Sequence, residues 1–193
     1  MIEKYLDYIA YLTRNLNKYF EAQEPYIFCK RGCAKCCQSG EYPFSRLEFD
    51  FINIGYYQLQ PDLRQNVQSK ILKLKQEKSE SKEQVFMYEC PFLINNECSV
   101  YNYRGIICRT FGLISSAEGG EPSKIPFCAY QGLNYSNVLD TETNIISEEK
   151  FLKLKTDKQP LVYNVSYKFL TGKTVEDTFG IKFGEKRPLL DWF

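Results

Sequence analysis

The chain has 193 residues, enough for one compact domain. Its 25 lysine and arginine residues nearly balance its 24 aspartate and glutamate residues, so bulk charge indicates neither a nucleic-acid partner nor an anionic membrane. The sequence contains no histidine, which excludes Cys-His nucleophile pairs, Cys₂His₂ zinc fingers, histidine-based zinc proteases and the two-histidine iron triad. Any metal must therefore be bound by sulfur and oxygen.

Residues 2–20 are predicted to form an amphipathic helix. Apolar side chains recur there at intervals of three and four residues, at Ile2, Tyr5, Leu6, Ile9, Leu12, Leu16, Tyr19 and Phe20. Charged residues interrupt the first ten positions, so this segment lacks the continuous apolar core of a secretory signal, and no stretch approaches membrane-spanning length. These features favour a cytoplasmic protein without a membrane partner.

Four cysteines follow within nine residues of one another. They are Cys29, Cys33, Cys36 and Cys37. If residues 29–37 were helical, their spacing would place all four sulfur atoms on one face, whereas in turns, Gly32 would allow a knuckle around a metal. Neighbouring side chains diverge and rarely chelate one ion together, so Cys36 and Cys37 favour two nearby metals or one polynuclear centre.

Two further helices are predicted after the cluster. Ser45 and Glu48 have the spacing of a capping box, which predicts a helix from about Leu47 to Tyr57. A second helix should begin after Pro61-Asp62 and end in the charged run at residues 75–83. Its apolar face would carry Leu63, Val67, Ile71 and Leu74.

A β-hairpin is predicted at residues 91–101. Asn95-Asn96 can adopt the positive φ angles of a two-residue turn, which would bring Cys90 and Cys98 to neighbouring positions. Residues 112–124 are predicted to form a loop that returns the chain to Cys128. Farther along, residues 147–155 favour a helix and residues 161–167 a strand.

These elements predict an α+β, mainly helical fold. We expect a single domain with a cysteine-cluster metal-binding core at about residues 26–130, the N-terminal helix at 2–20 and a C-terminal extension at 135–193. The metal site would lie between the 29–37 segment, the small β-hairpin and the 108–128 loop. Lys30, Arg31, Lys35 and Arg109 stand close enough in sequence to offset its negative charge.

All eight cysteines are candidate metal ligands. Clustered thiolates in a reducing compartment are balanced most readily by a soft cation such as zinc or iron. A disulfide framework is disfavoured because the chain is large enough for its own core and carries no export signal. Eight thiolates fit two Cys₄ sites, a polynuclear thiolate cluster, or one or two iron–sulfur clusters. The candidates are Cys29, Cys33, Cys36, Cys37, Cys90, Cys98, Cys108 and Cys128.

The cysteine pattern and the motifs after it resemble a known family. The first four cysteines are followed by Cys90-Pro91-Phe92-Leu93, Glu97-Cys98-Ser99-Val100-Tyr101, Arg104 and Cys108-Arg109-Thr110-Phe111-Gly112. This string is similar to the YkgJ-type cysteine-cluster family, described as a putative zinc- or iron-chelating domain. The family usually has two residues between its first two cysteines, where this chain has three. The resemblance implies metal ligation by the cysteines from Cys29 to Cys108, and a similar cysteine domain occurs in flagellin lysine methylases.

Four functions are compatible with these features. The leading one is a cytoplasmic protein that holds zinc or iron through clustered thiolates, with folding coupled to metal binding. The second is an iron–sulfur protein in redox chemistry or protein side-chain modification. The third is an enzyme with an open coordination position and Glu48 or Glu89 as base, although no nucleotide loop, S-adenosylmethionine-type glycine motif or hydrolase elbow is present. The fourth is a zinc-stapled module that binds a partner protein.

Overall fold

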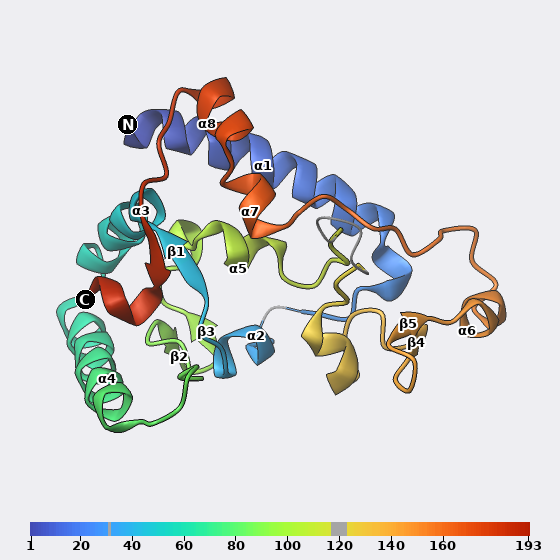
Figure 1. The fold of residues 1–193 in the computed structure, drawn as a ribbon, viewed down its shortest axis with the longest axis horizontal. Coiled ribbons are helices and arrows are strands. Elements are labelled where there is room, and N and C mark those ends of the chain that lie inside the picture. The colour runs from blue at the N-terminus through green and yellow to red at the C-terminus, as the bar shows by residue number, and fades with distance from the viewer. Residues whose placement is uncertain (31, 117–122) are drawn as a thin grey trace. The chain divides into compact units, whose positions relative to one another are not determined.

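The computed structural model describes residues 1–30, 32–116 and 123–193. The chain forms two compact units, whose helices and strands are drawn in Figure 1. Unit 1 comprises Met1–Ile2, Gly32–Cys108 and Ile181–Phe193, and unit 2 comprises Glu3–Arg31 and Arg109–Gly180. About half of the structure is helical and its strands form short antiparallel pairs. The predicted α+β, mainly helical fold class is confirmed.

Unit 1 contains the cysteine-rich segments and the C-terminal residues. Its elements are α2 (Lys35–Gln38), β1 (Pro43–Ser45), α3 (Arg46–Tyr57), α4 (Pro61–Glu80), β2 (Leu93–Ile94), β3 (Glu97–Cys98), the 3₁₀ helix η2 (Tyr101–Tyr103), the start of α5 (Ile106–Thr110), β6 (Lys186–Pro188) and η4 (Leu189–Trp192). β6 returns from the end of the chain and pairs antiparallel with β1, with Phe44 opposite Arg187 (Figure 1). This pairing places residues 181–193 beside the start of α3.

The core of unit 1 joins α3, α4, the hairpin and the C-terminal segment. Cys90, Cys98 and Cys108 pack against this core, together with the half-buried Trp192 and Phe193. The cysteines therefore lie on a closely packed apolar layer. Its buried members are Phe44, Phe49, Ile52, Tyr56, Val67, Ile71, Phe92, Val100 and Leu189.

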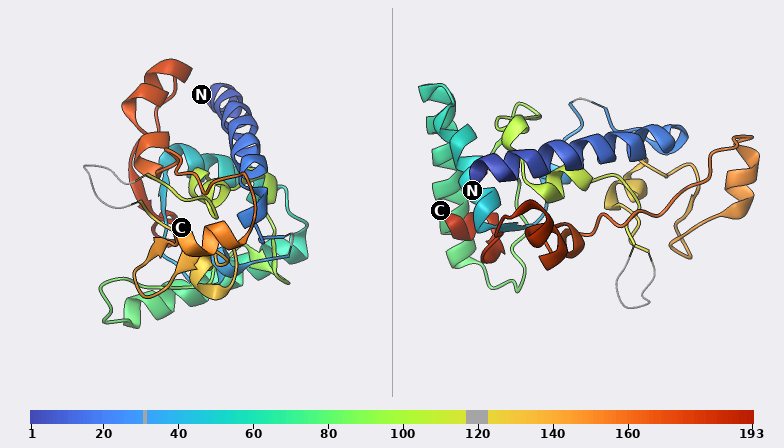
Figure 2. Two further views of the ribbon diagram at one scale, coloured as in Figure 1. Left: turned by 90° about the vertical axis from the view of Figure 1, so that its right-hand side faces the viewer. Right: turned by 90° about the horizontal axis from the view of Figure 1, so that it is seen from above.

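Unit 2 is built on the long helix α1 (Ile2–Ala22). Helices α7 (Tyr167–Leu170) and α8 (Lys173–Phe179) lie along α1 (Figure 2). The Tyr8 hydroxyl donates to the Leu170 carbonyl oxygen at 2.7 Å, and the Tyr8 and Phe179 rings are 4.9 Å apart. The remaining elements are η1 (Glu24–Tyr26), η3 (Phe127–Gln131), β4 (Leu139–Asp140), β5 (Ile145–Ile146) and α6 (Glu148–Lys153).

Most predicted elements are confirmed at nearly the predicted bounds. The N-terminal helix, the helices after Ser45 and Pro61 and the helix near residue 150 are all present. Ser45 and Glu48 form the predicted capping box. Asn95 and Asn96 have φ angles of 52° and 61°, and the hairpin pairs Leu93 with Cys98. Local sequence signals were sufficient here because a capping box and a two-residue turn each involve residues only a few positions apart.

Three other predicted segments were not confirmed as stated. The strand at residues 161–167 is wrong: Tyr163 forms a single bridge with Ser115, and α7 begins at Tyr167. The helix that begins at Pro61 runs through much of the charged run, to Glu80. The predicted loop at 112–124 falls partly outside the described residues. The single-domain prediction stays a prediction.

Among the described residues, no helix combines the length and the apolar character needed to cross a bilayer.

Candidate metal centre

Unit 1 gathers cysteines from four separate segments. The Sγ atoms of Cys36 and Cys37 lie 3.9 Å apart on α2. The backbone N–H of Cys90 donates to the Cys37 carbonyl oxygen at 2.8 Å, beside an antiparallel bridge between Gly40 and Tyr88. Cys98 on the hairpin and Cys108 on α5 are close enough to both Cys36 and Cys90 to interact with them electrostatically. Five thiols therefore lie in one neighbourhood.

The first cysteine segment combines a turn with a short helix. Gly32 has a φ angle of +86°, and α2 begins three residues later. The Ala34 carbonyl oxygen accepts from the backbone N–H groups of Cys37 and Gln38 at 2.8 and 3.0 Å. The expectation that the side chains of Cys36 and Cys37 diverge is wrong for this backbone, because the two sulfur atoms are in contact.

Burial is the main cause of the raised pKa of most of these thiols. Burial first, and negative charge on neighbouring cysteines second, raise the pKa of Cys90 to about 12 and the pKa of Cys108 well above its usual value. Burial likewise raises the pKa of Cys98. The hydrogen bond with Cys37, followed by burial, raises the pKa of Cys36. Several thiolates in this neighbourhood would therefore need a cation to balance them.

Two basic residues oppose these shifts. Arg104 lowers the pKa of Cys36 and Cys98, and Lys70 lowers that of Cys90. The Arg104 guanidinium lies 3.7 Å from the centre of the Tyr101 ring and donates to the Tyr101 carbonyl oxygen at 2.9 Å. The sequence analysis gave Arg104 only as part of the family motif. It missed Lys70, which precedes Cys90 by 20 positions and lies on a separate helix, α4.

Three of the four basic residues predicted to offset the charge belong to the described residues. Lys30 and Lys35 are exposed, and Arg31 is outside the described residues. Arg109 hydrogen-bonds to the Thr13 hydroxyl at 3.4 Å, within unit 2. Their contribution to the charge balance stays a prediction.

Glu48 serves as a helix cap and as a connection to the Cys108 helix. Its Oε2 accepts from the backbone N–H and the hydroxyl of Ser45 at 2.9 and 2.7 Å, and its Oε1 accepts from the N–H of Ile106 at 2.8 Å. The side chain is fully buried. Gly105 permits this approach, since a Cβ there would lie 2.9 Å from Oε1. This buried position makes Glu48 a poor candidate for a base that meets substrate.

Glu89, the other candidate base, forms an ion pair with Lys70 at 2.6 Å and is half exposed.

The remaining cysteines have different surroundings. Cys33 is half-buried in unit 1, just before α2. Cys29 is exposed and Cys128 is buried, and both belong to unit 2. All eight cysteines are described, and none of them forms a disulfide bond. The structure thus brings five of the eight predicted ligands together within unit 1.

Asn134 fixes the backbone at Cys29. Its side chain is fully buried, with Oδ1 accepting from the N–H groups of Phe28 and Cys29 at 2.9 and 2.8 Å. Its Nδ2 donates to the Gly112 carbonyl oxygen at 3.0 Å. No sequence signal pointed to this residue, since its partners lie 22 to 106 positions away.

Replacing Asn134 with alanine should lower the free energy of unfolding by about 2–4 kcal/mol, because three backbone polar groups lose their partner. Urea unfolding of the metal-free protein would measure the loss. Asn164→Ala is the matched control, because Asn164 accepts one exposed hydrogen bond from Ser116, and its effect should stay within about 0.5 kcal/mol. Equal stability of the two variants would contradict the assigned role of Asn134.

The donor chemistry of unit 1 fits a thiophilic cation, but its geometry is not that of a loaded site. Thiolates select zinc, copper(I) or iron–sulfur clusters, and five thiols exceed the four that one tetrahedral ion needs. Across residues 1–30, 32–116 and 123–193, no group of three or more cysteine, aspartate or glutamate side chains has the arrangement of a metal site. Metal binding would therefore draw the sulfur atoms closer together.

Comparison with known proteins gives one match. A family model, CxxCxxCC, described as a putative zinc- or iron-chelating domain, matches residues 28–129. No curated protein and no solved structure matches the chain. The matched region contains all eight cysteines and covers more than half of the sequence. The chain belongs to the CxxCxxCC family of putative zinc- or iron-chelating domains.

Proposed function

We propose that this protein is a cytoplasmic metal-binding protein that holds zinc or iron through thiolates, with Cys36, Cys37, Cys90, Cys98 and Cys108 as its main ligands. The observation that carries the proposal is the gathering of these five thiols from four segments of unit 1. Three of them, those of Cys90, Cys98 and Cys108, pack against one apolar layer. Free cysteines are often buried, but neighbouring, partly buried thiols disfavour one another's ionised form. A bound soft cation removes that penalty. Cys29, Cys33 and Cys128 are candidates for further ligand positions.

When bound, the metal would supply the positive charge that lets these thiols ionise, and the protein would supply a partly buried pocket of sulfur donors. The ligands lie near one another only in the folded protein, so the metal binds the folded state more tightly than the unfolded chain. Metal binding should therefore stabilise unit 1. The protein would thus chelate a metal, carry it, or depend on it as a structural ion that stabilises the fold.

An iron–sulfur cluster is the second candidate. It is favoured by the presence of five thiols in one neighbourhood, since one tetrahedral ion needs only four ligands and a polynuclear centre can use more. In that case the apolar surroundings would tune its potential.

Elemental analysis and an ultraviolet-visible spectrum of anaerobically purified protein test these proposals. Stoichiometric zinc without a visible band would support a zinc site, whereas iron with labile sulfide and a broad band near roughly 400 nm would identify an iron–sulfur cluster. Protein that is fully folded and free of metal, and that takes up none when reconstituted, would overturn both.

Single serine substitutions then identify the ligands. We expect Cys90→Ser and Cys108→Ser to lower metal affinity by well over the roughly 10- to 100-fold that loss of an outer-shell partner causes. Ser79→Ala is a control, because Ser79 is exposed on α4, donates to the Gln76 carbonyl oxygen and offers no sulfur. Unchanged metal content in both cysteine variants would contradict the assignment of ligands to unit 1.

A further inference from the structure

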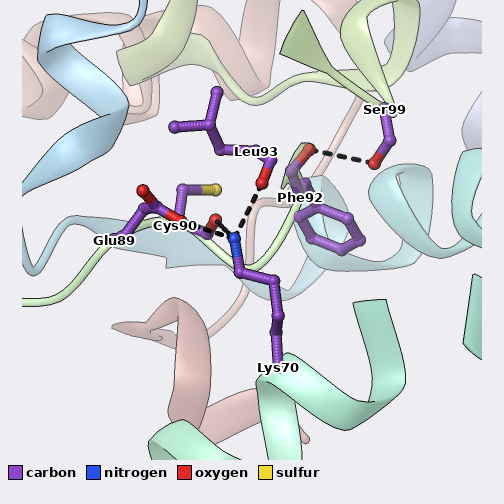
Figure 3. Close-up of polar contacts among 6 residues, drawn as sticks. All are labelled: Lys70, Glu89, Cys90, Phe92, Leu93 and Ser99. Carbon is purple, nitrogen blue, oxygen red and sulfur yellow. Dashed lines mark hydrogen bonds and ion pairs between the residues drawn. The ribbon is translucent and has the colours of Figure 1, made fainter. Parts of the chain in front are cut away.

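Lys70 on α4 reaches the turn that carries Cys90. Its ammonium group lies 2.6 Å from Glu89 Oε1, 2.7 Å from the Leu93 carbonyl oxygen and 3.4 Å from the Cys90 carbonyl oxygen (Figure 3). An ammonium group has three donors, and here each one faces an oxygen atom. The side chain is 29% exposed, so most of it is covered by the protein.

These contacts hold both ends of a tight turn. The Leu93 N–H donates to the Cys90 carbonyl oxygen at 3.0 Å, and Lys70 binds the carbonyl oxygens of the same two residues. Within the turn, the Phe92 carbonyl oxygen accepts from the N–H and the hydroxyl of Ser99 at 2.8 and 3.0 Å (Figure 3). Lys70 thus fixes the backbone from which the Cys90 thiol projects.

The same turn is joined to the first cysteine segment. The Cys90 N–H donates to the Cys37 carbonyl oxygen at 2.8 Å, so the backbones that carry two candidate ligands are directly paired. A change in the turn at residues 90–93 would alter the separation of these ligands. Because bond lengths to a metal are tightly defined, a small change in this separation affects binding.

Lys70 also places a fixed positive charge beside the thiols. Four thiolates around one divalent cation leave a formal excess of two negative charges, which outer charges and hydrogen bonds must offset. A lysine held by three oxygen atoms cannot swing into solvent as an unpaired surface lysine does.

Helix α4 has other attachments to unit 1. Val67 and Ile71 are buried in the core, and Lys78 binds Glu41 at 2.7 Å and Asp191 at 2.9 Å. Loss of the Lys70 ammonium should therefore leave α4 in place. What it would change is the turn at Cys90.

We propose that Lys70 is a positioning residue of the metal centre, which sets the Cys90 turn against Cys37 and offsets part of the thiolate charge. The proposal rests on the proposed function, and it assigns a role to a residue that is not itself a ligand.

The test compares Lys70→Met, Lys70→Arg and Lys73→Met. Methionine keeps an unbranched apolar side chain without the charge, whereas arginine keeps the charge but carries it on a planar fork that fits the three oxygen atoms poorly. Lys73 is the control because it lies on the same helix with an exposed side chain and a 3.7 Å ion pair to Glu77. Zinc affinity is measured by chelator competition, the cobalt(II) charge-transfer band reports ligand geometry, and amide hydrogen exchange is measured on the metal-free proteins.

In Lys70→Met, we expect faster exchange at the Cys90 and Leu93 amides, a shifted cobalt band and zinc affinity about 10- to 100-fold weaker. Lys70→Arg should recover part of the affinity, and Lys73→Met should match the wild type. Faster exchange with unchanged affinity would reduce Lys70 to a structural contact and overturn the proposal, as would unchanged exchange. Failure of the wild type to bind zinc, cobalt or iron would instead overturn the proposed function on which it rests.

Discussion

Replacing Glu48 with glutamine should lower the free energy of unfolding by about 1–3 kcal/mol, although the two side chains have nearly the same size. Glu48 accepts from two backbone N–H groups on opposite oxygen atoms, those of Ser45 and Ile106. Glutamine has one oxygen and one NH₂ group, so in either amide orientation one of these N–H groups faces another donor. A buried donor without an acceptor carries its full desolvation cost.

The substitution should also weaken metal binding. The Ile106 N–H lies at the start of α5, and Cys108 follows two residues later on the same helix. If the link to Glu48 is lost, the Cys108 thiol is less well fixed relative to the other cysteines. Urea unfolding with and without zinc would measure both effects.

Two variants make this prediction specific. Glu77→Gln removes an exposed carboxylate that pairs with Lys73 at 3.7 Å, and we expect a change of no more than about 0.5 kcal/mol. Glu48→Ala leaves both N–H groups without an acceptor and should cost more than Glu48→Gln. If Glu48→Gln is as stable as Glu77→Gln, the capping geometry does not hold α5 as described.

The double substitution Trp192→Ala and Phe193→Ala should destabilise unit 1 by about 3–5 kcal/mol. One fully buried aromatic side chain costs about this much when replaced by alanine, and these two are each half-buried. The Phe193 ring lies 5.0 Å from that of Phe49 and 6.2 Å from that of Phe92. The Trp192 ring stacks on Phe49 at 5.4 Å, and its indole N–H donates to the Phe44 carbonyl oxygen at 3.0 Å.

Because Cys90, Cys98 and Cys108 pack against the same core, we expect these thiols to react faster with an alkylating reagent in the metal-free double variant. Thermal unfolding and mass spectrometry of alkylated peptides measure the two effects. Leu72→Ala is the control, since Leu72 is 63% exposed on α4 and its loss should change stability by no more than about 0.5 kcal/mol. A double variant that behaves like Leu72→Ala would show that the C-terminal residues are dispensable for the cysteine layer.

Locally encoded features of this protein were predictable from the sequence. The capping box at Ser45, the Asn95-Asn96 turn and the apolar periodicity of α1 each depend on residues a few positions apart. The family was recognisable for the same reason, because its motifs are short runs around cysteines. Failure at residues 161–167 has a matching cause, since β-branched and aromatic residues favour a strand only where a partner strand is available.

By itself, the sequence determined the helices, the hairpin and the donor chemistry: eight thiols and no histidine leave sulfur as the main ligand for a soft metal. Only the tertiary structure decided which cysteines share a neighbourhood and which residues hold them there. Lys70, Glu48 and Asn134 act on backbone groups 20 to 106 positions away, and residues 181–193 complete the unit that contains six of the eight cysteines. Such contacts arise from packing of distant segments, and no local periodicity or spacing encodes them.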